Sequence, residues 1–219
     1  VRHQPCGQPT DHAHTAHAEV FVDGVGHDEH DWPDHGAGGE IQLTAYGISG
    51  IPVFQVSRYA AKALQMKKTV TAVLDLMPAV SDKGLRARLM WQMHASPKWT
   101  MRMVLSGMMN SKLAACLLKC AGIDGGQPCC KVDDRALERL IALVKHHEVH
   151  INATNDFEQS QATAGGVDTR EIDEKNMASK AVTGLYITGE LLDVDGICGG
   201  YNLQWAWATG VLAGSDAGR

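Results

Sequence analysis

The chain lacks the short motifs by which many enzymes are recognised. Its 219 residues contain no G-x-G-x-x-G, no G-x-S-x-G, no H-E-x-x-H and no Walker phosphate-binding sequence. Serine and histidine are plentiful, but no spacing places them as a nucleophile and its base. The sequence therefore contains no motif that supports assignment as a hydrolase.

Long apolar runs and an excess of positive charge are also absent. No apolar stretch approaches the roughly 20 residues of a membrane span, and no basic segment followed by an apolar one opens the chain. We therefore expect neither a membrane partner nor a signal peptide. The 20 Lys and Arg against 25 Asp and Glu give a net charge of -5, which provides no electrostatic case for a nucleic-acid partner.

The six cysteines are scattered through the chain. Cys116 and Cys120 lie one helical turn apart in an apolar run, which is typical of small core residues. The adjacent Cys129 and Cys130 cannot easily bond to each other. We expect free thiols, a reducing cytosol and a cytoplasmic location, with a disulfide framework as the alternative.

The first 80 residues predict a strand-rich region. Residues 1–17 show no periodicity, and we expect them to be ragged or disordered. Ser49 is the predicted N-cap of a helix in which Pro52 falls early. Alternating or β-branched apolar segments predict strands at 18–22, 40–46 and 69–76. Residues 18–80 are therefore assigned to a β-rich subdomain.

The pattern becomes helical from Ser81. Residues 81–147 are rich in Met, Leu, Ala, Lys and Arg, and we assign them to a helical subdomain. Breaks at 96–97, 110–111 and 122–128 divide it into about four helices. Its many methionines favour core packing over an adaptable binding groove.

Short strands and glycine turns return in residues 148–219. Strands are predicted at 149–154, 161–164 and 185–188, and a helix follows the last glycine pair. This strand–turn–helix arrangement is typical of α/β proteins that present backbone N–H groups to an anionic or electron-rich ligand. Two or three strands and one helix do not complete a doubly wound sheet of about five or six strands. We expect the remainder to come from sequence outside this chain.

Glycine pairs mark a candidate cofactor site in this last segment. Glycine permits positive φ angles and a close backbone approach to a flat ligand. An acid at a strand end can accept hydrogen bonds from sugar or polyol hydroxyls. Each pair alone could be an ordinary turn, but together they predict one side of a cofactor site. Its residues are Gly165, Gly166, Gly189, Glu190, Gly199, Gly200, Tyr201 and Asn202.

Two groups of possible metal ligands lack the residue spacing that a metal site requires. Seven of the 11 histidines lie in the first 35 positions, but no pair matches a zinc spacing on a predicted rigid element. They are His3, His12, His14, His17, His27, His30 and His35. Asp193 to Gly196 resembles the start of a calcium loop, but Gln204 stands where an EF-hand requires Glu. We predict no metal site, and a metal-binding protein remains the least favoured alternative.

Four segments carry a resemblance to a known family: residues 39–60, 161–173, 176–180 and 184–214. The chain resembles the C-terminal half of bacterial NAD(P)/FAD-dependent oxidoreductases, which include aminoacetone-oxidase-like and bile-acid-pathway flavoproteins. The resemblance implies a multidomain α+β fold: a β-barrel-like insert with a helical subdomain, then the C-terminal part of a Rossmann-like FAD-binding α/β domain. It also implies FAD in the intact protein, NAD(P)H as possible electron donor and a small-molecule substrate.

The same resemblance implies roles for the glycine residues. Gly189 and Glu190 match the ribityl or adjacent phosphate region, Gly165 and Gly166 match a turn near the flavin, and the segment from Gly199 to Asn202 matches the helix start that faces the pyrimidine edge of the flavin. The missing phosphate-binding motif implies that the chain needs an N-terminal FAD-binding half and is inactive alone. The catalytic residues are unknown, with Tyr46, Tyr201 and His94 as guesses. The alternative is a standalone protein-interaction module built on the helical subdomain.

Overall fold

The computed structural model describes residues 2–3, 14–23, 36–44, 47–155, 158, 160 and 162–219. The chain forms two compact units, Val1–Thr154 and Asn155–Arg219. Cys6, Tyr46 and four histidines of the N-terminal cluster (His12, His27, His30 and His35) lie outside the described residues. Within the described part, no group of three or more His, Cys, Asp or Glu side chains could hold a metal ion. No helix of that part is long and apolar enough to cross a membrane.

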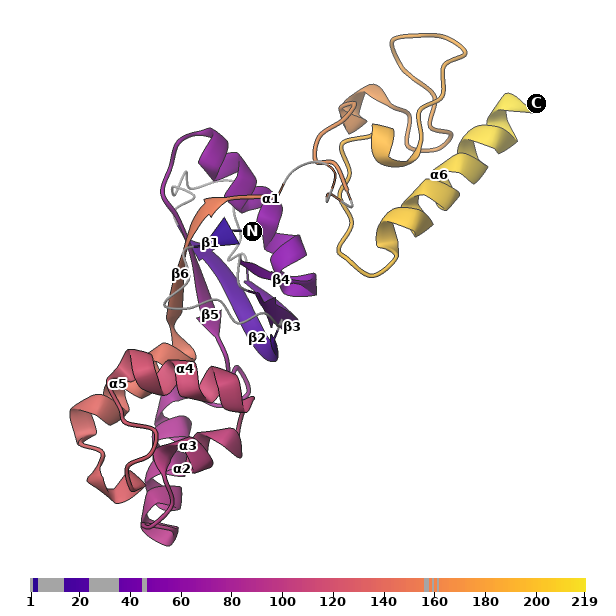
Figure 1. The fold of residues 1–219 in the computed structure, drawn as a ribbon. Coiled ribbons are helices and arrows are strands. Elements are labelled where there is room, and N and C mark those ends of the chain that lie inside the picture. Colours follow the sequence, from indigo (N-terminus) through magenta and orange to yellow (C-terminus); the bar gives the residue numbers. More distant parts are fainter. Residues whose placement is uncertain are drawn as a thin grey trace. The chain divides into compact units, whose positions relative to one another are not determined.

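The N-terminal unit is built on a six-stranded antiparallel sheet with the order β1-β6-β5-β2-β3-β4 (Figure 1). The three strands predicted for residues 18–80 are confirmed, with bounds shifted by a few residues. We expected a barrel-like arrangement, and the described strands follow an open order with β1 and β4 at its two ends. The strands are β1 (Arg2–His3), β2 (His14–Asp23), β3 (Gly36–Leu43), β4 (Ile48–Gly50), β5 (Val70–Asp75) and β6 (His147–Ala153).

One face of this sheet is covered by helix α1 (Ile51–Gln65). Alternate strand residues such as Val20, Ile41 and Leu74 are fully buried, because successive side chains of a strand point to opposite faces. The helix begins after Gly50 rather than after the predicted cap Ser49, and no side chain caps it. Gly50 has a φ of 109°, and a Cβ there would lie 2.5 Å from the carbonyl oxygen of Glu40. The close strand pairing therefore requires glycine at this position.

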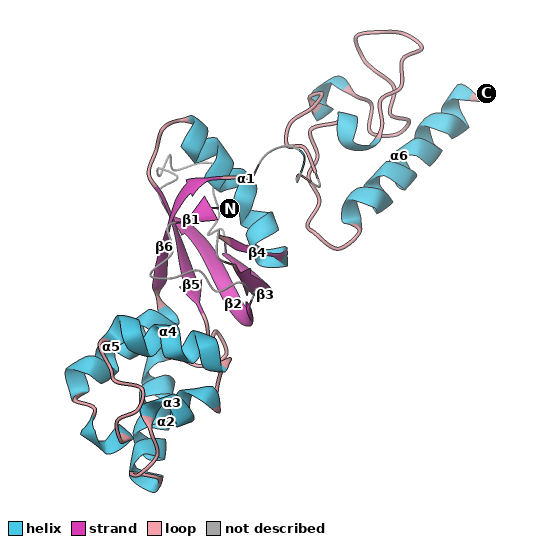
Figure 2. Cartoon of the chain, viewed as in Figure 1, coloured by secondary structure: helices cyan, strands magenta, loops and turns pink. Residues whose placement is uncertain are grey.

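Four helices follow β5, as predicted, before the chain returns to the sheet (Figure 2). Their N-caps are the short polar residues Ser81, Thr100, Asn110 and Asp133, each accepting a backbone N–H. Cys116 is exposed and Cys120 half-buried, so the prediction that both are core residues is wrong. The four helices are α2 (Asp82–Ala95), α3 (Met101–Ser106), α4 (Ser111–Ala121) and α5 (Asp134–Lys145).

A buried lysine ties the last of these helices to the sheet. Lys145 is only 5% exposed, and its Nζ donates to Asp75 Oδ2 at 2.6 Å. It also donates to the carbonyl oxygens of Met77 at 3.0 Å and Val80 at 2.5 Å. All three partners lie at or just after the end of β5. One ammonium group therefore donates hydrogen bonds to three acceptors in the segment that leads from β5 to α2.

The C-terminal unit has little regular structure apart from α6 (Tyr201–Ala217). Residues 162–219 contain no strand, so the strands predicted at 161–164 and 185–188 are wrong for the positions that the structure describes. Isolated bridges such as Val167 with Leu192 and Ala178 with Tyr186 take their place. Among the residues of this unit that the structure describes, the hydrophobic core has four buried members: Ile172, Met177, Leu192 and Ala213.

The boundary between the units differs from the sequence-based division. We assigned 148–219 to one segment, but β6 pairs with β5 and completes the sheet of the N-terminal unit. The β-rich and helical subdomains, which we separated at residue 80, share the compact unit Val1–Thr154. The pairing of β6 with β5 across the four intervening helices sets this boundary. Amino-acid composition does not reveal such a pairing.

Candidate functional site

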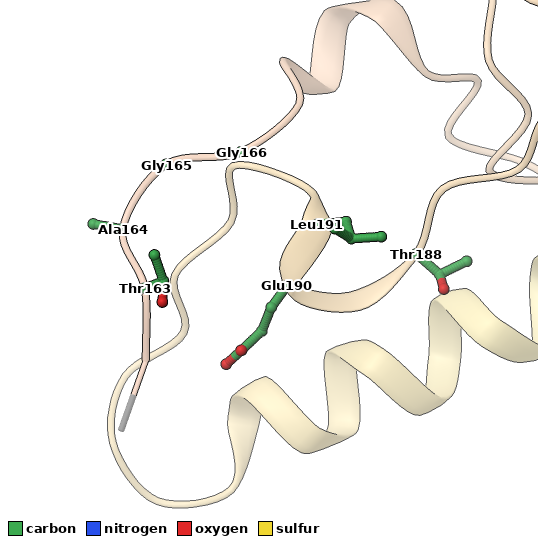
Figure 3. Close-up of a pocket in the computed structure, with 7 residues that line it drawn as sticks. All are labelled: Thr163, Ala164, Gly165, Gly166, Thr188, Glu190 and Leu191. Atoms are coloured by element: carbon green, nitrogen blue, oxygen red, sulfur yellow. The ribbon is translucent and has the colours of Figure 1, made fainter. Parts of the chain in front are cut away.

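The C-terminal unit contains an open hollow of about 650 Å³. Two segments far apart in the sequence line it, and each carries a predicted glycine position. Figure 3 shows the Glu190 side chain extending into the space beside Thr163. The lining residues are Thr163, Ala164, Gly165, Gly166, Thr188, Glu190 and Leu191. The structure thus brings Gly165, Gly166 and Glu190 together.

Two backbone hydrogen bonds hold these segments against each other. The Val167 N–H donates to the Leu191 carbonyl at 2.8 Å, and the Asp193 N–H donates to the Val167 carbonyl at 3.0 Å. A Cβ on Gly166 would lie 2.7 Å from the carbonyl oxygen of Leu191 and the same distance from the carbonyl carbon of Leu192. The close approach of the two backbones therefore excludes any side chain at position 166.

Gly189 is buried against the side of α6. Its N–H donates to the Thr209 hydroxyl at 3.0 Å, and its carbonyl accepts from the Trp205 indole at 3.2 Å. The Thr209 hydroxyl in turn donates to the carbonyl oxygen of Trp205 at 2.7 Å. Gly189 has a φ of 63°. These bonds fix the turn that presents Glu190, whose own side chain is exposed.

The sequence reasoning missed the two α6 residues that anchor this turn and the threonines beside the hollow. Thr209 is 1% exposed, and its buried hydroxyl needs a hydrogen-bond partner. This burial depends on the path of α6, so the sequence carried no signal for it. Thr188 directly precedes Gly189, and Thr163 directly precedes Ala164 and the first glycine pair. Both threonines could have been included in the predicted site, because each lies within two residues of a predicted glycine.

The remaining predicted residues lie at the start of α6 and not in the lining of the hollow. Gly199 and Gly200 have φ angles of 130° and 97°, and a Cβ on either would meet no atom within 4 Å. No side chain caps the helix. The N–H groups of its first turn therefore have no partner within the helix. The Asn202 side chain does not face outward, since its Oδ1 accepts from Gly196 N at 2.7 Å.

Two pairs of ionisable groups in this unit are already engaged with each other. Asp168 accepts from Arg170 through both carboxylate oxygens, and this guanidinium holds the pKa of Asp168 at about 2. The Tyr186 hydroxyl donates to Asp216 at 2.8 Å, and this bond to the carboxylate raises the tyrosine pKa. Both pairs stabilise loops of the unit, so neither supplies an unengaged acid or base.

Neither of the two guessed proton donors that the structure describes, His94 and Tyr201, is among the residues that line the hollow. His94 is an exposed residue of α2 in the other unit, and its Nδ1 lies 2.7 Å from the Met90 carbonyl oxygen. Tyr201 is 59% exposed at the first position of α6. Tyr46 lies outside the described residues. The expectation of free thiols is confirmed for the five described cysteines.

A family model described as the HI0933-like protein Rossmann domain matches residues 12–216. The chain belongs to this family. It is 44% identical over 179 residues to a 3-dehydro-bile acid delta(4,6)-reductase of Clostridium scindens, across 82% of the chain and 44% of that relative. The resemblance to flavoprotein oxidoreductases is thereby confirmed, and membership implies a flavin cofactor.

Two further relatives of this HI0933-like chain act on a different substrate. It is 32% identical over 170 residues to a ribosomal RNA dihydrouridine synthase of Haemophilus influenzae, across 78% of the chain and 40% of the relative. It is also 32% identical over 177 residues to the Escherichia coli protein of that name, across 80% and 42%. The chain spans less than half the length of these curated relatives.

Proposed function

We propose that this HI0933-like chain contributes the isoalloxazine and ribityl side of an FAD site in a flavin-dependent oxidoreductase. The observation that carries the proposal is the hollow where the segments around Gly166 and Glu190 meet. There Gly165 has a φ of 98°, and a Cβ on it would meet no atom within 4 Å, so the space beside its backbone is open. A flat ring system can approach such a backbone closely.

The residues around the hollow fit a flavin by their chemistry. The Glu190 carboxylate accepts hydrogen bonds, and the hydroxyls of Thr163 and Thr188 both donate and accept them, which suits a polyol such as the ribityl chain. The uncapped start of α6 offers N–H groups and the positive end of a helix dipole. When bound, the flavin supplies hydride transfer. The chain's own contribution is to bind it and to stabilise negative charge at its ring.

The partner that we propose is the N-terminal FAD-binding half of the same protein. Three large apolar side chains of α6 are mostly exposed: Leu203 by 71%, Trp207 by 75% and Val211 by 68%. They recur every four residues, so they form one stripe along the helix. Burying a side chain of this kind contributes about 1.5–3 kcal/mol. The described residues of the unit include four buried core residues, a small core that such a cover would extend.

The substrate class follows from chemistry shared by the relatives' names. A 3-oxo steroid with double bonds at positions 4 and 6 and a uracil ring both contain a carbon–carbon double bond conjugated to a carbonyl group. We propose that the intact enzyme reduces such a bond. A flavin held at the hollow by Glu190 and the neighbouring threonines would supply a hydride for the β carbon, with NAD(P)H as the electron donor, and water or an acidic group would supply the proton for the α carbon. A small-molecule substrate is the expectation from the sequence.

Comparison of the chain with the intact protein tests this proposal. We expect the 219-residue chain alone to be colourless and without turnover. The chain with its N-terminal half should retain a flavin absorption band and oxidise NAD(P)H when a 3-oxo-4,6-diene steroid is added. A yellow preparation of the chain alone would contradict the need for the other half. A colourless intact protein would contradict the flavin site itself.

A matched pair of variants tests the stripe on α6. Trp207→Ser in the intact protein should weaken the association of the two halves and reduce flavin retention. Phe54→Ser, at a 45%-exposed aromatic on α1 in the other unit, is the control and should change neither. Equal effects of the two substitutions would exclude the stripe as the surface that the other half covers.

A further inference from the structure

Sulfur-containing side chains are concentrated in the helical part of the chain. Residues 90–130 contain six of the nine methionines and four of the six cysteines. Carboxylates are scarce there, since the segment from Lys83 to Ile123 contains seven Lys and Arg and no Asp or Glu. Two of these cysteines, Cys116 and Cys120, lie four positions apart on α4. This part of the chain therefore offers soft sulfur ligands without the hard oxygen ligands that calcium or magnesium prefers.

Helix α4 holds Cys116 and Cys120 in a fixed register. Residues four apart on a helix are neighbours on its surface, with Cβ atoms about 5–6 Å apart. Helical side chains lean toward the preceding turn, so both thiols lean in the same direction. The helix itself is anchored by the buried side chains of Leu113 and Leu117. Cys116 is exposed and Cys120 is half-buried, so the pair is open to an ion from solvent.

The spacing of this pair is too wide for a disulfide bond. A disulfide requires Cβ atoms about 3.5–4.5 Å apart, which is closer than the helix places Cys116 and Cys120. Both are free thiols in the structure. An ion between the two sulfurs adds two metal–sulfur bonds, each about 2.3 Å long in the case of zinc, and therefore spans a wider gap. The geometry fits a bridging ion better than a sulfur–sulfur bond.

The number and the kind of ligands decide which ion fits. A structural zinc ion takes four ligands and calcium takes six to eight, whereas no described group of His, Cys, Asp or Glu side chains has even three members suited to a metal. Cu(I) is a soft, closed-shell ion that prefers sulfur ligands and is stable between two of them in a line. The sequence expectation of no metal site rests on histidine and aspartate spacings, which do not bear on a pair of thiols.

We propose that Cys116 and Cys120 bind one Cu(I) ion between their sulfur atoms. Each thiol releases one proton to solvent as its sulfur binds, no electron is transferred, and the complex keeps one negative charge. Lys112 precedes Cys116 by four positions and Lys119 follows it by three, so these exposed ammonium groups share the same face of α4. Their positive charge stabilises the anionic complex. The site lies in the N-terminal unit, goes beyond the flavin site, and can be measured without flavin.

Titration of the reduced 219-residue chain with Cu(I) under nitrogen tests this site. The chain competes for the ion with the chromogenic chelator bathocuproine disulfonate, and the absorbance of the chelator complex falls as the protein takes up Cu(I). We expect one tightly bound Cu(I) per chain, with an affinity that rises with pH because two protons leave. Cys116→Ser and Cys120→Ser should each weaken binding about 100- to 10,000-fold, since the second thiolate binds an ion that the first already holds. Circular dichroism verifies that each variant folds.

Two control variants separate the position of the thiols from their number. Cys130→Ser removes another exposed thiol and should leave tight binding unchanged. Cys116→Ser with Ala115→Cys preserves the number of thiols but separates the pair by five positions, which takes one thiol off the shared face, and should abolish tight binding. Equal losses in Cys130→Ser and Cys116→Ser, or tight binding that survives the move to position 115, would overturn the proposal and indicate an adventitious ion only. None of these results bears on flavin binding, so the two proposals fail separately.

Discussion

Replacement of the buried Lys145 by methionine should destabilise the N-terminal unit more than any exposed substitution. Methionine preserves most of the side-chain volume and removes only the ammonium group. The change leaves Asp75 Oδ2 without its donor at 2.6 Å, together with the carbonyl oxygens of Met77 and Val80. The Asp75 side chain is 16% exposed, so water reaches it only in part.

The size of the effect follows from this geometry. Removing one partner of a buried ion pair costs about 3–5 kcal/mol, because the other charge stays buried without compensation. Asp75 keeps one bond, from the Met77 N–H to its Oδ1 at 2.9 Å, which places the effect near the lower end. At about 2–4 °C per kcal/mol for a unit of this size, we expect the Tm to fall by about 6–12 °C.

Thermal unfolding followed by circular dichroism measures this change. Lys68→Met, at an exposed position after α1, is the control and should stay within about 0.5 kcal/mol of the parent chain. Adding Asp75→Asn to Lys145→Met removes the uncompensated charge and should recover at least about 1 kcal/mol. If Lys145→Met unfolds like the control, or if the double variant is no more stable than the single one, the pairing argument is wrong.

Two further predictions concern single positions. Gly166→Ala forces a Cβ to within 2.7 Å of backbone atoms and should lower the Tm of the C-terminal unit more than Gly165→Ala, which shares the positive φ but whose Cβ meets nothing within 4 Å; overpacking of this kind costs about 1–3 kcal/mol, and equal Tm values for the two variants would contradict it. Burial raises the pKa of the Cys129 thiol, so a thiol-reactive disulfide reagent should modify the exposed Cys116 and Cys130 first, as mapped by mass spectrometry. Modification of Cys129 at the same rate would show that its burial does not protect it.

The N-terminal unit was largely predictable because its patterns are local. Apolar alternation in 69–76 and helical periodicity after Ser81 both reflect faces that pack within this unit. The prediction of Ser49 as N-cap failed because the pairing of β4 with β3 places Gly50 against the Glu40 carbonyl, a contact distant in sequence. Strand β6 was predicted, but a short stretch of sequence does not show that it pairs with β5.

The C-terminal unit was less predictable for a physical reason. A strand needs a neighbouring backbone, and the described residues give 185–188 only one isolated bridge, at Tyr186. Its apolar pattern therefore predicted a strand that this unit alone cannot form. The glycine positions were more informative, since a positive φ or a close backbone approach is a property of the residue itself. The sequence therefore singles out Gly165 and Gly166, which the structure places with Glu190 at one hollow, whereas the positions of Thr209 and Trp205 depend on the path of α6.

The composition of α6 argues that the unit packs against further structure. One face carries Trp205, Thr209 and Ala213, at intervals of four, and this face holds Gly189 and the small core. The other face carries the exposed stripe of Leu203, Trp207 and Val211 at the same interval. A surface helix is normally apolar on one face only, and a helix that is apolar all round lies between two layers. The described unit provides one of those layers. We propose that the N-terminal half provides the second layer, so that its packing against α6 would both cover the stripe and complete the flavin site.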